Sequence, residues 1–248
     1  MPIIDVHAEI GTTPLWGVPF TDANLTRSMQ KYGVEKAVVS STIGNSCCFL
    51  RGNAQIAGLL KTNKAMTGCV VVNVNYLEQS QEEMRKYLGD ESFAGLLLTS
   101  GIRDRHVMPA EAEDILNAHR RFVKPVFVHT FSRESLLAAN DMAKAFPIMK
   151  FVLLTMGGDE WRMASMLAEK TLNLVLEVSG SFSPDKIKFA VEHIGSHRMV
   201  YGSGLPYTDP ACTIGLVEDA DISDGDKANI FEVTARRLFG RRPLKTEN

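Results

Sequence analysis

Cysteine is scarce in this sequence, and its spacing carries no recognisable pattern. The chain has 4 cysteines in 248 residues, and no two are separated by the two residues typical of zinc ribbons and thiol–disulfide centres. Cys47 and Cys48 are adjacent, which disfavours a disulfide between them within one sheet. The sequence therefore predicts free thiols and argues against a cysteine-based metal or redox site.

Long apolar runs and a charge imbalance are also missing. The apolar stretches at 70–74 and 96–98 are far shorter than the roughly 20 residues that a membrane span requires. The 27 Lys and Arg nearly balance the 29 Asp and Glu, so no bias toward nucleic acid or acidic membrane appears. No charged-then-apolar leader opens the sequence. We therefore expect a cytoplasmic protein that binds neither nucleic acid nor membrane.

No glycine-rich dinucleotide fingerprint follows the first apolar run. What the sequence has instead is a series of short, nearly continuous apolar runs, typical of strands that are covered on both faces in a parallel sheet. Eight such runs occur, at 2–11, 36–40, 68–72, 93–98, 125–128, 150–154, 172–176 and 198–201.

Helical patterns lie between these runs, at 22–32, 55–62, 110–121, 133–145 and 161–170. Ser80 and Glu83 form a capping-box pattern that predicts a helix over 84–88. Ser183 before Pro184 predicts a helix that ends at Gly195, and Ser223 predicts the start of the last one.

Alternating strands and helices favour an α/β fold, and eight units favour a closed (β/α)8 TIM barrel of the metal-dependent-hydrolase type. The length and the 45% hydrophobic content suit a single barrel domain over 1–240, with 241–248 as a flexible tail. A doubly wound open sheet is the alternative architecture.

Polar side chains stand where the predicted strands end. Asp5, His7 and Glu9 alternate along the first strand, so the period of two predicts one shared face. In a barrel of this kind, the carboxyl ends of the strands build the functional site. The other residues predicted at that edge are Thr42, Asn73, Thr99, His129, Thr155, Met156, Glu177, Ser179, Ser203 and Gly204. Two histidines and two glutamates are thus expected at one cavity mouth.

Segment 3–11, IIDVHAEIG, resembles the opening I-D-x-H-x-H-x-G of the amidohydrolase superfamily, in particular the branch of aminocarboxymuconate-semialdehyde decarboxylase-like enzymes. Segments 124–130, 198–206 and 233–239 resemble, in the same order, the family's fifth-strand histidine segment, its eighth-strand G-S-D-x-P and its closing N-A-x-x-L-F helix. The resemblance implies a TIM barrel with a divalent metal ion bound by His7 and His129.

The departures from the family pattern fall on the chemistry. Glu9 stands in place of the second histidine, Gly204 in place of the metal-binding aspartate, and Thr155 in place of the sixth-strand histidine. Thr99 ends a strand that often reads G-x-K-x-H in this branch. A carboxylate at Glu9 can still bind a metal ion, but Gly204 supplies neither a ligand nor a base for metal-bound water.

We predict that His7, Glu9 and His129 bind one divalent ion, with zinc as the first choice. Glu177 and Glu9 are the candidate catalytic bases, and the candidate substrate contacts are Thr155, Ser203 and Thr99. The predicted activity is hydrolysis or decarboxylation of a small cyclic or carboxylate metabolite, and assembly into a homo-oligomer is left open. The alternative is a metal-free, inactive barrel of the same ancestry that binds a small molecule or serves in regulation.

Overall fold

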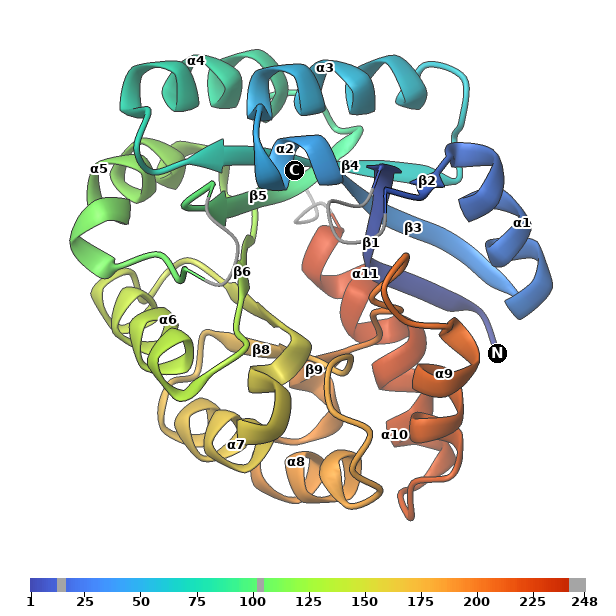
Figure 1. Ribbon diagram of the computed structural model, residues 1–248. Coiled ribbons are helices and arrows are strands. Elements are labelled where there is room, and N and C mark those ends of the chain that lie inside the picture. The colour runs from blue at the N-terminus through green and yellow to red at the C-terminus, as the bar shows by residue number, and fades with distance from the viewer. Residues whose placement is uncertain (13–16, 102–104, 241–248) are drawn as a thin grey trace, which may run out of the picture.

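One curled sheet organises the computed structural model, which describes residues 1–12, 17–101 and 105–240 (Figure 1). Within these residues, eight strands run parallel in chain order, and the short strand β2 (Pro19–Phe20) pairs antiparallel with the end of β1. The parallel strands are β1 (Ile3–Thr12), β3 (Val34–Ser41), β4 (Met66–Asn73), β5 (Phe93–Thr99), β6 (Val126–His129), β7 (Phe151–Leu154), β8 (Leu174–Glu177) and β9 (Met199–Val200). Each coincides with one of the eight predicted apolar runs, so the predicted (β/α)8 barrel is confirmed.

Helices form a ring around the sheet (Figure 1). They are α1 (Asp22–Tyr32), α2 (Thr42–Ser46), α3 (Phe49–Leu60), α4 (Leu77–Tyr87), α5 (Pro109–His119), α6 (Arg133–Ala145), α7 (Trp161–Lys170), α8 (Lys186–Ile194), α9 (Pro210–Glu218), α10 (Asp224–Ala228) and α11 (Thr234–Phe239). Within the described ranges, none of these helices is both long and apolar enough to cross a membrane. The predicted tail at 241–248 lies outside the described residues.

Two predicted helix starts are wrong. Helix α4 begins at Leu77, and Ser80 is buried within it, where its Oγ donates to Asn73 O and accepts from Asn73 N at 2.9 and 3.1 Å. The capping-box prediction is wrong because the Ser80 hydroxyl is hydrogen-bonded to the backbone of Asn73, at the end of the preceding strand. Helix α8 begins at Lys186 rather than at Pro184, although it ends before Gly195 as predicted. Ser223 is confirmed as an N-cap, since its Oγ accepts from Asp226 N.

The barrel closes between β1 and the segment that follows β9. Val6 N donates to Tyr201 O at 3.0 Å, and Glu9 N donates to Leu205 O at 2.9 Å. The buried carboxylate of Asp5 reinforces this seam, because its Oδ1 accepts from His7 N at 3.0 Å and from Ser203 N at 2.9 Å. Asp5 therefore joins the first strand to the last and is a structural residue.

A β-bulge in β1 sets the direction of its side chains. Asp5 pairs with Ala37 and Ala8 with Val39, so three steps along β1 match two along β3. Ile4, before the bulge, and Val6, within it, pack with the residues inside the barrel. His7, the next residue within the bulge, also borders the interior, where it lines a small cavity with Val6. The prediction that Asp5 shares a face with His7 and Glu9 is therefore wrong, because the extra residue shifts the alternation by one.

We expect Asp5→Ala to lower the free energy of unfolding by about 2 to 4 kcal/mol, because two buried N–H groups lose their acceptor. Urea unfolding followed by circular dichroism measures the change. The matched control is Asp5→Asn, whose side-chain oxygen can accept the same bonds and which should stay within about 1 kcal/mol of the parent. Equal losses for both variants would contradict the role assigned to the oxygen.

Candidate metal centre

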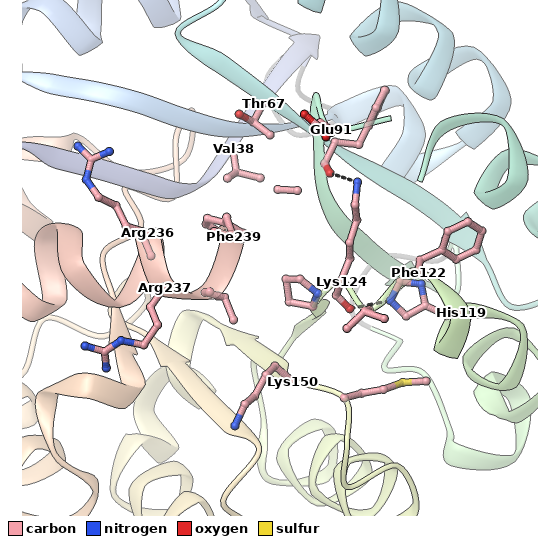
Figure 2. Close-up of a pocket in the computed structure, with 18 of the residues that line it drawn as sticks. Val38, Thr67, Glu91, His119, Phe122, Lys124, Lys150, Arg236, Arg237 and Phe239 are labelled. Atoms are coloured by element: carbon pink, nitrogen blue, oxygen red, sulfur yellow. Dashed lines mark hydrogen bonds between the residues drawn. The ribbon is translucent and has the colours of Figure 1, made fainter. Parts of the chain in front are cut away.

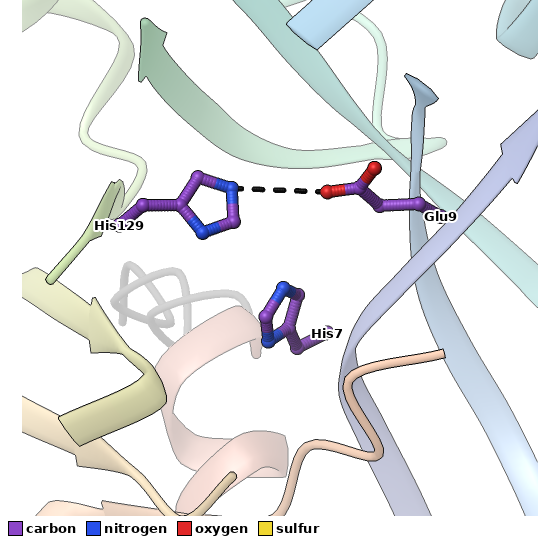
Figure 3. A group of neighbouring side chains, drawn as sticks. All are labelled: His7, Glu9 and His129. Atoms are coloured by element: carbon purple, nitrogen blue, oxygen red, sulfur yellow. Dashed lines mark ion pairs between the residues drawn. The ribbon is translucent and has the colours of Figure 1, made fainter. Parts of the chain in front are cut away.

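Three potential metal ligands converge at the carboxyl ends of the strands. His7 comes from the bulge of β1, Glu9 from the part of β1 beyond it, and His129 is the last residue of β6. Each offers one ligand atom, and these atoms lie within 4.8 Å of one another. Figure 3 shows the three side chains around a common space, with a ring nitrogen of His7 facing the other two. The structure thus brings together the three residues predicted as ligands.

Glu177 at the end of β8 holds the far side of the His7 ring. Its Oε2 lies 2.9 Å from His7 Nδ1, which leaves Nε2 as the nitrogen available to a metal ion. Burial lowers the pKa of His7, but the negative charges of Glu177, Glu9 and Asp5 outweigh burial and leave this pKa above its ordinary value. A carboxylate that orients a ligating imidazole is a recurrent feature of metal sites.

The Glu177 carboxylate is itself fully buried and heavily hydrogen-bonded. It accepts from Thr155 N at 2.9 Å, from Ser179 N at 2.6 Å and from Ser179 Oγ at 2.8 Å, besides its contact with His7. Burial raises the pKa of Glu177, yet His7 and these N–H donors bring it below its ordinary value. Gly202 completes the enclosure, since a Cβ atom there would collide with Glu177 Oε1. The carboxylate is therefore fixed in its ionised form.

His129 is placed as a neutral imidazole beside Glu9. Its Nε2 lies 3.8 Å from Glu9 Oε1, and its buried Nδ1 has no hydrogen-bond partner among the described residues. Burial and the neighbouring His7 lower the pKa of His129 to about 3. Its ring stacks on that of Phe131, with centroids 5.4 Å apart. Neutral imidazole is the form of histidine that binds metal ions.

The donor set fits a divalent cation. Two ligands at about 2.1 Å from one ion lie at most about 4.2 Å apart, and the Glu9–His129 separation of 3.8 Å is inside that limit. The 4.8 Å bound on the whole cluster requires only a small inward movement of one side chain. Two imidazoles and one carboxylate suit zinc, iron and related ions. The fit therefore rests on the chemistry of the donor set and on the spacing of its ligand atoms.

Gly204 leaves the fourth position of the family pattern without a side chain. Its φ of 70° is in the left-handed region, and its N–H donates to His7 O at 3.0 Å. A Cβ atom at 204 would meet Thr208 Oγ1 at 3.4 Å and Ser179 Cβ at 3.5 Å, which are ordinary contacts. The space therefore admits a larger residue, although the backbone conformation favours glycine.

The predicted substrate contacts lie at or just beyond the carboxyl ends of their strands, and each already has other hydrogen-bond partners. Ser203 Oγ donates to His7 O, and Thr155 Oγ1 donates to Thr130 O at 2.6 Å. Thr99 Oγ1 donates to Asn45 O and accepts from Gly101 N. Their role in binding substrate stays a prediction, as does that of Glu177 as a base.

Sequence reasoning missed the enclosure of Glu177 and the placement of Phe131. The local indication of the enclosure was Gly202, because a glycine at a strand end lets another side chain approach the backbone closely. Phe131 follows His129 by two residues, and its side chain is 57% exposed beside the candidate ligands. Both roles depend on contacts that the order of residues does not reveal.

The fold and site thus define a closed (β/α)8 barrel with a group of candidate metal ligands at the carboxyl ends of its strands. The sequence profile described as amidohydrolase matches residues 4–241. The chain belongs to the amidohydrolase family.

Solved structures share the fold at low sequence identity. A 2,6-dihydroxybenzoate decarboxylase complexed with 2,6-dihydroxybenzoate has a TM-score of 0.80 at 14% identity, over 96% of this chain and 99% of that chain. A dihydroxybenzoic acid decarboxylase from Polaromonas sp. JS666, with bound manganese and the inhibitor 2-nitroresorcinol, has a TM-score of 0.80 at 14% identity, over 96% of each chain. An uncharacterized TIM-barrel protein from Bordetella bronchiseptica has a TM-score of 0.79 at 15% identity, over 97% of this chain and 100% of that chain.

Glu177→Gln should weaken the binding of a divalent ion by about 10- to 100-fold, because the neutral amide no longer fixes the His7 ring and its tautomer. Isothermal titration of the metal-free protein with Zn²⁺ and Mn²⁺ measures the affinity. Glu83→Gln is the control, since Glu83 is also buried but hydrogen-bonds to Asn53 away from the site. If both variants bind the metal ion as tightly as the parent protein does, Glu177 does not influence metal binding.

Proposed function

We propose that this protein is a metal-dependent decarboxylase or hydrolase that acts on a small carboxylated aromatic or cyclic molecule. The observation that carries the proposal is the convergence of His7, Glu9 and His129 within 4.8 Å at the carboxyl ends of the barrel strands. These three residues would hold one divalent ion. Such an ion acts as a Lewis acid that polarises a bound carboxylate or carbonyl oxygen.

The protein's own residues would prepare that site. Glu177 keeps the Nδ1 edge of His7 occupied, so that the opposite nitrogen faces the substrate end of the barrel. The hydrogen bonds from Thr155 N and Ser179 to the Glu177 carboxylate hold it in place while substrate binds. Because the whole chain of contacts is buried, its geometry is set before any ligand arrives.

Decarboxylation agrees with the residues better than hydrolysis does. Hydrolysis requires a base that takes a proton from an attacking water, and Gly204 removes the side chain that supplies it in the family pattern. Loss of carbon dioxide from an aromatic carboxylate needs no such attack: the bond to the carboxylate breaks, its electron pair stays on the ring carbon, and that carbon takes a proton that comes from solvent. The solved structures named above include two dihydroxybenzoate-type decarboxylases, which supports the same choice.

An aromatic substrate is supported by the mouth of the site. Phe131 stacks on His129 with an interplanar angle of 9° and exposes more than half of its side chain. An exposed ring beside a candidate ligand offers a surface for a flat, apolar molecule. Glu9 remains the second candidate for a catalytic base in this proposal.

The donor set supports zinc, whereas three solved structures of similar fold, including the Polaromonas enzyme, contain manganese. A metal-free binding protein is the second candidate function, favoured by the missing side chain at Gly204.

We further propose that 1–240 form one domain and that the protein acts in the cytoplasm on a small molecule. Homo-oligomer formation stays a prediction.

Glu9→Gln should weaken Zn²⁺ or Mn²⁺ binding by at least about tenfold and abolish turnover, because an amide oxygen is a poorer ligand than a carboxylate. Metal titration and carbon dioxide release from 2,6-dihydroxybenzoate are the two measurements. The control is Glu134→Gln in the exposed first turn of α6, which should leave both unchanged. If the parent protein binds neither ion after supplementation, the metal-free alternative is correct.

Gly204→Asp should raise metal affinity by at least about tenfold and permit hydrolysis of simple esters, because it adds a ligand and a proton acceptor. The left-handed backbone costs about 1 to 2 kcal/mol of stability for any side chain. Gly204→Asn is the control, since it bears the same strain without a carboxylate. Equal metal affinities for the two variants would show that Gly204 does not limit the centre.

A further inference from the structure

A large cavity lies at the opposite end of the barrel from the metal centre. Its volume is about 1080 Å³, and its walls come from the first residues of β3 to β7 and from helix α11. Figure 2 shows residues from these elements around it, including Val38, Thr67, Lys150 and Phe239. Since the candidate ligands stand at the strand ends and this cavity at the strand starts, the two sites are separated by the barrel core.

Basic side chains dominate the lining of this cavity. Against the single carboxylate of Glu91 stand six cations, Lys36, Arg120, Lys124, Lys150, Arg236 and Arg237. The whole chain, by contrast, carries 29 acidic and 27 basic residues. Positive charge is therefore concentrated at this end of the barrel well beyond the average for the protein.

Some of these cations are already engaged. Arg236 pairs with Glu35 at 2.9 Å and with Glu232 at 2.6 Å. Lys124 donates to the backbone oxygens of Asp90 and Phe93. Within the described residues, the remaining four form no ion pair: Lys36, Arg120, Lys150 and Arg237. Unpaired cations around a concave surface create a positive potential that attracts anions.

The interior of the cavity is apolar. Val38, Ala94 and Phe93 are buried wall residues, and Phe239 stacks on Phe127 with ring centroids 6.2 Å apart. At the rim, Ile148 is 82% exposed and so extends the apolar surface outward. An apolar interior under a cationic rim matches a molecule with an apolar body and an anionic end.

We propose that this cavity is a second binding site, which takes a small amphipathic anion: an aromatic or acyl group that ends in a carboxylate, sulfonate or phosphate. The apolar body lies against Val38, Ala94 and Phe239, and the anionic end lies among Lys150, Arg237 and their neighbours. The proposal is independent of the function assigned to the metal centre.

The test uses the full-length protein and two fluorescent probes of similar shape. One is 8-anilinonaphthalene-1-sulfonate, and the other is the uncharged N-phenyl-1-naphthylamine. We expect the sulfonate to bind at one site per chain and more tightly than the neutral probe. Lys150→Gln combined with Arg237→Gln should weaken sulfonate binding by about tenfold, while the neutral probe changes less than about twofold. Added salt should weaken only the sulfonate.

Arg133→Gln combined with Arg162→Gln is the matched control. Both residues are exposed in first helical turns at the other end of the barrel, so the control removes the same two charges. Equal weakening by the control pair, equal affinities for the two probes, or no binding of the sulfonate would overturn the proposal. Sedimentation at several protein concentrations adds a further check, since a dimer that excludes the sulfonate would make this cavity a subunit interface instead.

Discussion

Between Asp5 and Ala8, strand β1 carries one residue more than the strand beside it, and the candidate site depends on this bulge. Without the extra residue, the interior face of β1 would continue from Ile4 and Val6 to Ala8, and His7 and Glu9 would point toward the helices. The same few residues also close the barrel, because the Asp5 carboxylate accepts N–H groups from His7 and from Ser203. The Asp5 carboxylate therefore helps to close the barrel and also holds the backbone at His7, although Asp5 is not one of the candidate ligands.

Burial determines the charge states around His7. An isolated buried histidine loses its proton easily, and His129 behaves in this way, with a pKa near 3. His7 differs because the ionised Glu177 lies 2.9 Å away and is itself held by two backbone N–H groups. His7 and His129 thus differ in proton affinity although their ring centroids are only 5.3 Å apart. The cause is the Glu177 carboxylate at the end of β8, a strand that pairs with β9 beside the seam that closes the barrel.

The two ends of the barrel differ in the charge of the side chains that they expose. At the carboxyl ends of the strands, buried His and Glu side chains form a compact centre of the kind that binds a cation. At the strand starts, six Lys and Arg side chains line a wide cavity, and four of them form no ion pair among the described residues. Packed interior residues, such as Phe127 and Val152, fill the space between the two ends.

The sequence by itself determined the barrel and the grouping of the three candidate ligands. Continuous apolar runs predict strands buried on both faces, and polar residues at the ends of such strands must meet at one edge. His7, Glu9 and His129 could be grouped on that basis. Local patterns in the sequence did not predict which side chains of β1 face the interior, the start of α4 at Leu77 or the hydrogen-bond partner of the His7 ring. Glu177 lies 170 residues from His7, and Ser80 is engaged by a strand residue rather than by its own helix end. Only the tertiary structure decided these features, because each depends on contacts between distant segments whose geometry local periodicity does not encode.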